Sequence, residues 1–499
     1  MQGRFPQTVV FILAAVVALG AQPLPAQQAA AADPTLQEQL NTWYARTVRR
    51  VPGEWGVAVA DQRGQLIWGV NATRPLMPAS TVKLFTTGFA RSVLGANARQ
   101  VTRVVGTGFV DLEGNWMGSW ALEVNGDPTL ERPARSGPML RDLAAQLAER
   151  GIRRITGPMA IQSAAGEAGA SYPTAWHTRH MGRRFAPLVG SVTLNENIIS
   201  FTIAPGGRVG APPRVVASSP EGMERIVDIK AKTVAGRRDR LRILVSAGGR
   251  YEVSGTIGTG RRGRVYTAPA ANPRVVLEAA WGAALARAGI EWVPGTSLGD
   301  PASRAGSEAL AEVVSAPLDS IAHEVNTRSL NIGAEALLRW ADPGPDAARK
   351  LTEHVRQITG DQTGVTLADG SGLSYEDRAS PWSFVAYLAK FPTTPAGRNF
   401  PLLLPANGTG TLRRLGTGPL APGVVRAKTG TLANAATLVG YLGHRDGMLL
   451  ISVMYNGSRV YGAKQEQWKL FRLLGAQGQI IPTDSTEADA IGGDALPPN

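Results

Sequence analysis

A serine and a lysine three residues apart, Ser80 and Lys83, could form a nucleophile and its base. Met77-Pro78-Ala79 precedes them and indicates a helix start, and residues three apart share one face of a helix. A serine hydroxyl becomes a good nucleophile only when a neighbouring base takes its proton. A lysine serves as that base only if burial or a second cation lowers its pKa. Alone, however, S-x-x-K more often marks a capped helix with an incidental lysine.

Two further polar clusters lie far downstream. Ser329-Leu330-Asn331 stands just before a predicted helical stretch at 332–340 and supplies a hydroxyl and an amide at a turn. Lys428-Thr429-Gly430-Thr431 is predicted to end a strand, where it offers a cation, a hydroxyl and a glycine that lets a substrate backbone approach the strand edge. Each cluster is common in proteins, so neither indicates a function by itself.

Together, in this order, the three clusters match the S-x-x-K, S-x-N and K-T-G signature of serine penicillin-binding proteins and β-lactamases. Four further segments sharpen the resemblance: Gly-Asp-Pro-Thr-Leu at 126–130, Asn-Glu-Asn at 195–197, Asp-Gly-Ser-Gly-Leu-Ser at 369–374 and Gly-Thr-Leu at 410–412. With them, the chain resembles the low-molecular-mass class C penicillin-binding proteins, the D-alanyl-D-alanine carboxypeptidase/endopeptidase family typified by penicillin-binding protein 4. The likeness covers nearly all of the chain beyond its first residues.

The resemblance implies an acyl-transfer site with two sets of residues. The catalytic set is Ser80, Lys83, Ser329, Asn331 and Lys428. The substrate-binding set is Thr429, Gly430, Thr431, Leu373 and Leu432. Neither a metal nor a cofactor is implied.

In the mechanism that the resemblance implies, Ser80 attacks the carbonyl of the penultimate D-alanine of a peptidoglycan stem peptide, and water then cleaves the acyl-enzyme. Lys83 takes the proton of Ser80, its neutral form favoured by the positive field of Lys428. Ser329 passes a proton toward the leaving D-alanine, and Asn331 orients Lys83 and the substrate amide.

The same resemblance implies how the substrate is held. Lys428 and Thr429 bind the terminal carboxylate through charge-assisted hydrogen bonds. The backbone N–H groups of Ser80 and Thr431 form the oxyanion hole. Because β-lactam antibiotics present a strained amide and a carboxylate in similar positions, they are expected to acylate Ser80.

The chain departs from the family pattern at two places. Many relatives carry Arg after the Gly-Leu-Ser of the 369–374 segment, where this chain has Tyr375. Some use an acidic residue shortly after a tryptophan to hold the amine of a stem diamino acid, whereas Trp176 is followed here by His177, Thr178 and Arg179. The preferred stem-peptide side chain is therefore open.

Elements from both ends of the chain are expected to position these clusters. Residues 55–59 and 65–70 flank a turn and form a hairpin, followed by a helix at 79–89. Residues 424–428 form a third strand, and 437–442 with 448–455 form a hairpin around Asp446-Gly447, before a last helix at 462–474. Five strands and flanking helices predict an α/β (α+β) fold, a β-lactamase/transpeptidase-like domain with one antiparallel sheet and helices on both faces.

A long, mostly β insertion is expected to interrupt this domain. Residues 33–100 and 312–482 are assigned to the catalytic domain, and 101–311 to the insertion. Family members carry such an insertion as two domains, which implies 101–160 with 273–311 as a second domain and 161–272 as a third. Helical stretches at 140–150 and 275–288 each end at a glycine.

Composition limits the remaining functions. The 499 residues include 43% apolar and 18% charged residues, so the chain can bury several cores. The absence of cysteine excludes a disulfide scaffold, thiol catalysis and Cys-ligated zinc. A net charge of +13 suggests anionic surroundings such as a membrane face or a cell wall, but 6% aromatic residues without a stacking motif argue against nucleic-acid binding.

Two motif-like segments have simpler interpretations. The G-x-G-x-x-G pattern at 258–263 is followed by Pro269 and Pro273 where a helix should begin, which indicates a basic loop and not a dinucleotide site. His177 and His180 lie three apart without further clustered ligands, so we expect surface histidines and no metal site.

The chain ends indicate export. Residues 1–26 contain an apolar run at 9–19 and a small-residue exit, as in a secretory signal peptide. The run is shorter than the roughly 20 residues of a spanning helix, so no stable membrane anchor is expected. The acidic tail at 483–499 is predicted to be disordered. The protein should be secreted across the inner membrane into the periplasm, and its oligomeric state is open.

The sequence leaves two alternatives to a D-Ala-D-Ala carboxypeptidase with possible endopeptidase activity. A β-lactamase shares the three motifs and differs in how fast its acyl-enzyme is hydrolysed. A non-catalytic peptidoglycan-binding protein would keep the fold without turnover.

Overall fold

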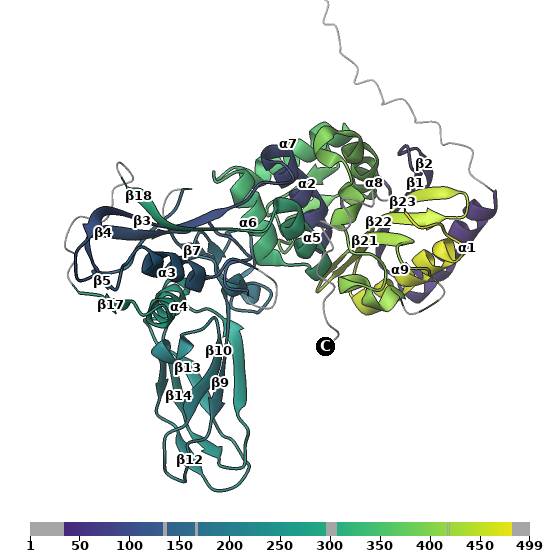
Figure 1. The fold of residues 1–499 in the computed structure, drawn as a ribbon. Helices are drawn as coiled ribbons and strands as arrows, with labels where there is room; N and C mark the ends of the chain where they lie inside the picture. Colours follow the sequence, from purple (N-terminus) through teal and green to yellow (C-terminus); the bar gives the residue numbers. More distant parts are fainter. Residues whose placement is uncertain are drawn as a thin grey trace, which may run out of the picture.

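The computed structural model describes residues 34–132, 137–164, 168–295, 307–416, 418 and 420–481. The predicted signal peptide at 1–26 and the predicted tail at 483–499 lie outside these residues. A helix-covered sheet occupies one end of the molecule and a long β-rich region the other (Figure 1). We call residues 34–100 and 315–481 the core region, and residues 101–314 the inserted region.

Strands from both ends of the chain form one five-stranded antiparallel sheet in the order β2-β1-β23-β22-β21, which confirms the predicted sheet. Its strands are β1 (Glu54–Asp61), β2 (Leu66–Val70), β21 (Val425–Leu432), β22 (Ala435–His444) and β23 (Gly447–Asn456). β1 pairs with β23 through Val57 opposite Val453, so the first strand of the chain adjoins the last. The lysine motif was expected at a strand end, but β21 continues through it and Lys428 pairs with Val439.

Helices cover both faces of this sheet because both faces are apolar. Val57 and Val59 pack with α1 (Pro34–Arg50) and α9 (Val460–Gly475), whereas Ala58 and Ala60 face the other helices. Alternate residues of a strand point to opposite faces, so β1 lies in the middle layer of three. The helices of the second face are α2 (Val82–Leu94), α5 (Leu318–Arg328), α6 (Asn331–Ala341), α7 (Ala347–Thr359) and α8 (Pro381–Lys390).

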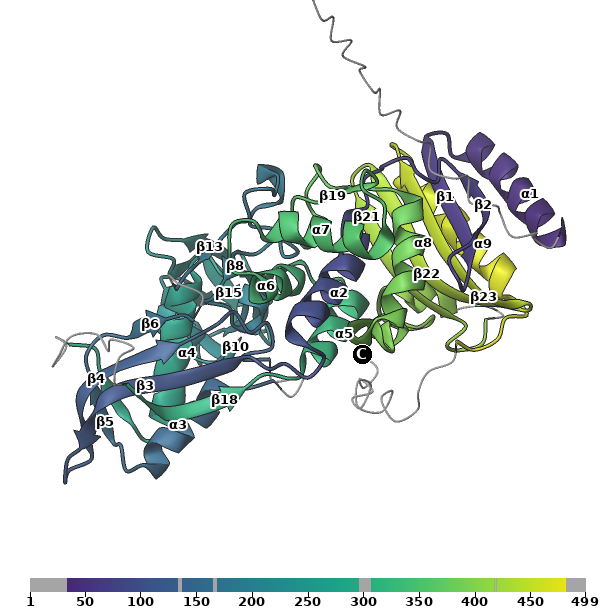
Figure 2. The same ribbon diagram turned by 90° about the horizontal axis from the view of Figure 1, so that it is seen from above.

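The inserted region leaves the core region after α2 and returns before α5. Its first sheet has the order β17-β5-β4-β3-β18, with β6 paired to β4. The outgoing strand β3 and the returning strand β18 pair directly, so both connections run side by side (Figure 2). The boundary expected at 311–312 lies within β18. The elements of this part are β3 (Val101–Val110), β4 (Asn115–Glu123), α3 (Leu140–Glu149), β5 (Arg154–Thr156), β6 (Ala160–Gln162), α4 (Pro273–Arg287), β17 (Glu291–Val293) and β18 (Glu308–Val314).

The middle of the inserted region, residues 198–269, forms a narrow arm that extends away from α4 (Figure 1). Its strands form the sheets β10-β9-β16, β11-β14-β13 and β12-β15. The insertion is thus mostly β structure, as expected. The strands are β9 (Ile198–Ala204), β10 (Arg214–Ser219), β11 (Val227–Ile229), β12 (Lys232–Val234), β13 (Arg242–Val245), β14 (Tyr251–Ser254), β15 (Thr256–Gly258) and β16 (Arg264–Pro269).

Two short hairpin-like pairs complete the fold. β7 (Ala170–Ser171) pairs with β8 (Val189–Gly190), and β19 (Val365–Thr366) pairs with β20 (Arg378–Ala379). Within the described ranges, no helix combines the length and the apolar character that crossing a bilayer requires.

Candidate active site

Ser80 lies in a tight turn that opens α2. The residue before it, Ala79, adopts the left-handed conformation with φ of 49°, which costs a non-glycine residue about 1–2 kcal/mol. Two glycines pack against this turn. A Cβ on Gly372 would overlap the Ala79 carbonyl, and a Cβ on Gly430 would lie 2.7 Å from the Pro78 carbonyl oxygen. Close packing from two sides therefore fixes the turn that presents the half-buried Ser80.

Lys83 contacts the Ser80 hydroxyl from the first turn of α2. Its Nζ lies 3.1 Å from Ser80 Oγ and donates to Asn331 Oδ1 at 2.7 Å and to the Ser371 carbonyl oxygen. A neutral amine has two N–H donors and one lone pair. The two carbonyl oxygens can take both donors, which leaves the lone pair for the Ser80 proton. This arrangement is the one that a general base requires.

Burial lowers the pKa of Lys83 to about 8, while the nearby carboxylates of Asp369, Glu335 and Asp377 act in the opposite direction. The pKa of Lys428 is also lowered, first by burial and then by the charge of Lys83. Burial, and not the field of Lys428 that we expected, is therefore the main cause for Lys83. Both amines are fully buried at 0% exposure.

Ser329 stands at the end of α5 in the left-handed conformation, with φ of 58°. Lys428 Nζ reaches it from β21 and lies 2.9 Å from Ser329 Oγ, and it also donates to the Thr429 carbonyl oxygen at 2.7 Å. The second hydroxyl of the site is thus held by the second buried amine.

An ion-pair network from the inserted region holds the residue before Ser329. Glu196 pairs with Arg328 and, at 2.9 Å, with Arg132. Arg132 also pairs with Glu324 of α5 at 2.5 Å. The side chains of Arg132 and Glu196 are only 6% and 13% exposed, so removing one member would leave a poorly solvated charge without its partner.

Both the oxygen and the nitrogen of the Asn331 side-chain amide form hydrogen bonds within the protein. Its Oδ1 accepts from Lys83, and its Nδ2 donates to the Phe185 carbonyl oxygen of the inserted region at 2.8 Å. The geometry suits the expected orientation of Lys83. The expected contact with a substrate amide, in contrast, would have to displace the bond to Phe185.

Gly430 was expected to let a substrate backbone approach the strand edge, but other residues of the protein pack closely around it. A Cβ at this position would overlap Thr437 Oγ1 and approach the Pro78 carbonyl oxygen. The glycine is therefore required where β21 packs against the turn before Ser80, and not to admit a substrate backbone.

The three motifs open into a cleft of about 460 Å³. Seven of the ten expected site residues line it: Ser80, Ser329, Asn331, Leu373, Thr429, Thr431 and Leu432. Lys83, Lys428 and Gly430 lie buried behind this wall. Of the other lining residues, Thr411 belongs to the Gly-Thr-Leu segment at 410–412, and the motifs indicated none of the remaining five: His180, Phe185, Ala433, Lys464 and Trp468. Among the described residues that line the cleft there is no carboxylate.

His180 was expected at the surface, yet it lines the cleft. Its ring stacks on Tyr375, with centroids 5.6 Å apart, and meets Phe185 edge-on. The Arg179 guanidinium lies 4.5 Å from the centroid of the Tyr375 ring. Burial, helped by the charge of Arg179, lowers the pKa of His180. The two departures from the family pattern, at Tyr375 and at 177–179, thus pack against each other beside the cleft.

Asp369 organises the loop 369–374 that faces Lys83. Its carboxylate accepts hydrogen bonds from four successive backbone N–H groups at 2.6–3.1 Å, and from the indole of Trp176 at 3.0 Å. Trp176 belongs to the inserted region and is 2% exposed. Because the same loop presents the Ser371 carbonyl to Lys83, Trp176 is connected to the base through one carboxylate.

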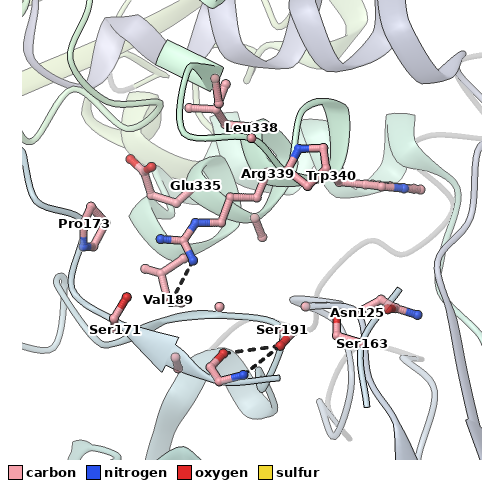
Figure 3. Close-up of a pocket in the computed structure, with 18 of the residues that line it drawn as sticks. Asn125, Ser163, Ser171, Pro173, Val189, Ser191, Glu335, Leu338, Arg339 and Trp340 are labelled. Carbon is pink, nitrogen blue, oxygen red and sulfur yellow. Dashed lines mark hydrogen bonds between the residues drawn. The ribbon is translucent and has the colours of Figure 1, made fainter. Parts of the chain in front are cut away.

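A larger cavity, of about 1080 Å³, lies beside this loop, between α6 and the inserted region (Figure 3). Glu335 and Arg339 point into it and continue the face of α6 that begins with Asn331, at intervals of four residues. Arg339 donates to the Val189 carbonyl at 3.1 Å, and Glu335 accepts from Gly370 N at 3.1 Å. Burial raises the pKa of Glu335 to about 8. One helix face therefore connects the cleft, a buried acid and this cavity.

Over the ranges that the structure describes, no group of three or more His, Cys, Asp or Glu side chains is arranged to hold a metal ion.

Comparisons with known proteins show what the chain is similar to. Residues 36–473 match the D-Ala-D-Ala carboxypeptidase 3 (S13) family. The chain is 27% identical over 483 residues to a D-alanyl-D-alanine carboxypeptidase of Actinomadura sp. (strain R39), which covers 91% of this chain and 87% of the relative.

The fold is similar to that of penicillin binding protein 4 from Haemophilus influenzae, with a TM-score of 0.66, 21% identity and coverage of 86% of this chain and 98% of the other. A structure of that protein complexed with a β-lactam matches with a TM-score of 0.63, 21% identity and coverage of 86% and 99%. Because the family match spans both the core and the inserted region, the chain belongs to the D-Ala-D-Ala carboxypeptidase 3 (S13) family of serine peptidases.

Proposed function

We propose that this protein is a serine-type D-alanyl-D-alanine carboxypeptidase, with D,D-endopeptidase activity on cross-linked stems, in which Ser80 is the nucleophile and Lys83 its base. The observation that carries the proposal is the surrounding of Lys83. It is fully buried, its pKa is lowered to about 8, and its hydrogen bonds leave one lone pair for Ser80.

The reaction begins when Ser80 Oγ attacks the carbonyl carbon of the penultimate D-alanine and its proton passes to Lys83 Nζ. The oxyanion lies against the backbone N–H groups of Ser80 and Thr431, and losing one such donor costs about 3–4 kcal/mol of transition-state stabilisation. Ser329, held by Lys428, gives a proton to the leaving nitrogen as the C–N bond breaks, and the proton that Lys83 took from Ser80 replaces it, which restores the neutral amine. A water molecule then attacks the ester as Lys83 takes its proton, and that proton passes to Ser80 Oγ as the acyl–oxygen bond breaks.

Thr429, which lines the cleft, binds the substrate carboxylate next to the scissile amide, and the buried Lys428 behind it supplies positive charge. Burial lowers the pKa of Lys428, and an incoming carboxylate acts in the opposite direction, because its negative charge favours the ammonium form. A cross-linked stem carries a carboxylate beside the amide nitrogen that leaves, so the same contact serves endopeptidase cleavage.

The charges around the cleft limit which stem-peptide side chains it can recognise. The described lining contains no Asp or Glu, and Arg179 and His180 occupy the neighbourhood of Tyr375. We therefore infer that a stem diamino acid is not recognised through a free ammonium group.

We further propose that β-lactams acylate Ser80, because the Haemophilus influenzae neighbour has been solved in complex with a β-lactam. Residues 1–26 are proposed to direct export to the periplasm, where peptidoglycan stem peptides are accessible.

We likewise propose that the chain divides into three domains. They are a catalytic domain at 33–100 with 312–482, a second domain at 101–160 with 273–311 and a third at 161–272. This division is supported by the separate sheets of the core region, the first part of the insertion and the arm.

The test combines labelling with product analysis. Labelled penicillin should attach covalently, mass spectrometry should place the adduct on Ser80, and Ser80→Ala should abolish it. Release of D-alanine from a synthetic stem peptide should require the same serine. Labelling that persists in Ser80→Ala would contradict the proposal.

A β-lactamase would share the first half of this reaction but hydrolyse its acyl-enzyme rapidly. No carboxylate in the described lining is placed to activate a water for that step. We therefore expect a long-lived penicillin adduct and slow turnover of a chromogenic cephalosporin compared with D-alanine release. Rapid cephalosporin turnover without D-alanine release would favour the β-lactamase instead, and wall binding without turnover a non-catalytic protein.

A further inference from the structure

The arm of the inserted region carries most of the surplus positive charge of the chain. Residues 205–266 contain 13 Lys and Arg against 5 Asp and Glu, a surplus of eight in a chain whose total is +13. Several of these acids are already neutralised locally. Asp239, for example, pairs with Arg261 and Arg264 at 2.9 and 2.8 Å.

Most of the cations left over lie at the end of the arm, which we call the tip: residues 206–211, 232–240 and 256–262. Backbone hydrogen bonds hold its three segments together, from Thr233 N to the Ala211 carbonyl at 3.0 Å and from Gly260 N to the Gly236 carbonyl at 2.8 Å. Six exposed cations of the tip pair with no carboxylate of the described chain: Arg208, Lys232, Arg237, Arg238, Arg240 and Arg262.

The shape of the arm suits a planar partner. β12, at the centre of the tip, lies at the outermost end of the arm, away from the sheet of the core region (Figure 1). A flat surface meets only what protrudes from a protein, whereas a flexible polymer is more often bound in a groove. Docking through the tip would also leave the cleft at the other end of the molecule accessible.

The side chains of the tip suit phospholipids. Five of the six unpaired cations are arginines, whose guanidinium groups bind phosphate bidentately. Clusters of four to eight Lys or Arg are typical of segments that bind anionic lipid headgroups. Val209 stands among them with 57% of its surface exposed, and an apolar side chain gains free energy at the boundary between headgroups and acyl chains.

We propose that the tip docks this protein reversibly on a bilayer of anionic phospholipids, with its arginines on lipid phosphates and Val209 at the acyl boundary. This contact is peripheral, and it does not depend on the enzymatic activity proposed above.

The experiment is co-sedimentation of the full chain with vesicles. We expect binding to vesicles of phosphatidylglycerol and phosphatidylcholine, none to phosphatidylcholine alone, and loss of binding in 0.5 M salt because the charges are screened. Arg237→Gln with Arg238→Gln should lower the partition constant about 25-fold, roughly fivefold for each charge removed. The control, Arg46→Gln with Arg49→Gln on exposed positions of α1, removes the same charge elsewhere and should change binding less than twofold.

Each outcome decides the proposal. Equal loss in both variants would show attraction by overall charge and overturn it, as would unchanged binding of the tip variant. Binding to isolated peptidoglycan that depends on Arg237 and Arg238, without vesicle binding, would assign the tip to a wall polymer instead. Thermal unfolding of each variant checks its fold, and Arg237→Lys with Arg238→Lys, which keeps the charge, should retain most of the binding.

Discussion

The rate at which penicillin acylates Ser80 should rise with pH and level off above the pKa of Lys83, because only the neutral amine accepts the Ser80 proton. With a pKa of about 8, roughly a tenth of Lys83 is neutral at pH 7. If the pKa of Lys83 had its ordinary value of 10.5, Lys83 would be neutral in only about one molecule in 3000 at pH 7. Burial of Lys83 therefore makes the active base about 300-fold more abundant at pH 7.

Glu335→Gln tests the cause of this pKa. Glu335 is one of three carboxylates that raise the pKa of Lys83, and glutamine keeps an acceptor for Gly370 N. Because Glu335 has a pKa of about 8 and is only partly ionised at the midpoint, we expect the midpoint of the rate profile to move down by roughly half a pH unit. Glu376→Gln, an exposed carboxylate after the 369–374 loop, is the matched control and should leave the midpoint in place. The assay is the second-order rate constant of labelling by a fluorescent penicillin between pH 6 and 9.5.

A labelling rate that stays flat, or falls, between pH 6 and 9 would remove Lys83 from the role of base. A rising profile whose midpoint is the same in wild type and Glu335→Gln would keep Lys83 as the base but refute our account of its pKa.

Trp176→Phe removes the indole donor from Asp369 and should slow labelling of Ser80 roughly three- to tenfold, since one hydrogen bond to a charged group is lost; labelling kinetics equal to wild type would exclude this link. Gly430→Ala places a Cβ against Thr437 Oγ1, so we expect the unfolding temperature to fall by several degrees, and Thr437→Ala to restore part of it; a thermal melt of the three variants measures this. Burial raises the pKa of Glu335 from 4.5 to about 8, so the native state binds this proton more tightly than the unfolded chain, and the free energy of unfolding should decrease as pH rises from about 4.5 to 8. Urea unfolding at pH 5, 6.5 and 8 should show a smaller decrease in Glu335→Gln.

The local geometry of the site could be predicted from the sequence. A hydroxyl and an amine three residues apart face each other on any helix, and Ser80 and Lys83 lie 3.1 Å apart. Apolar runs beside turn residues likewise predicted the five strands of the sheet, because both signals are local properties of the sequence.

Burial could not be predicted in the same way. The pKa of Lys83 depends on burial and on carboxylates that the fold brings from remote positions in the sequence, at Glu335, Asp369 and Asp377. His180 shows the same limit. Its partner Tyr375 is remote in sequence, and a pair of histidines three apart carries no signal that distinguishes a cleft from open surface.

The inserted region is a structural component of the cleft. Trp176 bonds to Asp369, the Phe185 carbonyl to Asn331, and Glu196 to Arg328, next to Ser329. Without residues 101–314, Asp369 and Asn331 would each lose one hydrogen-bond partner and Arg328 would lose one ion-pair partner. A hydrogen bond contributes about 0.5–1.5 kcal/mol, so the loop 369–374 and the turn at Ser329 depend in part on the inserted region. The active site therefore belongs to both regions.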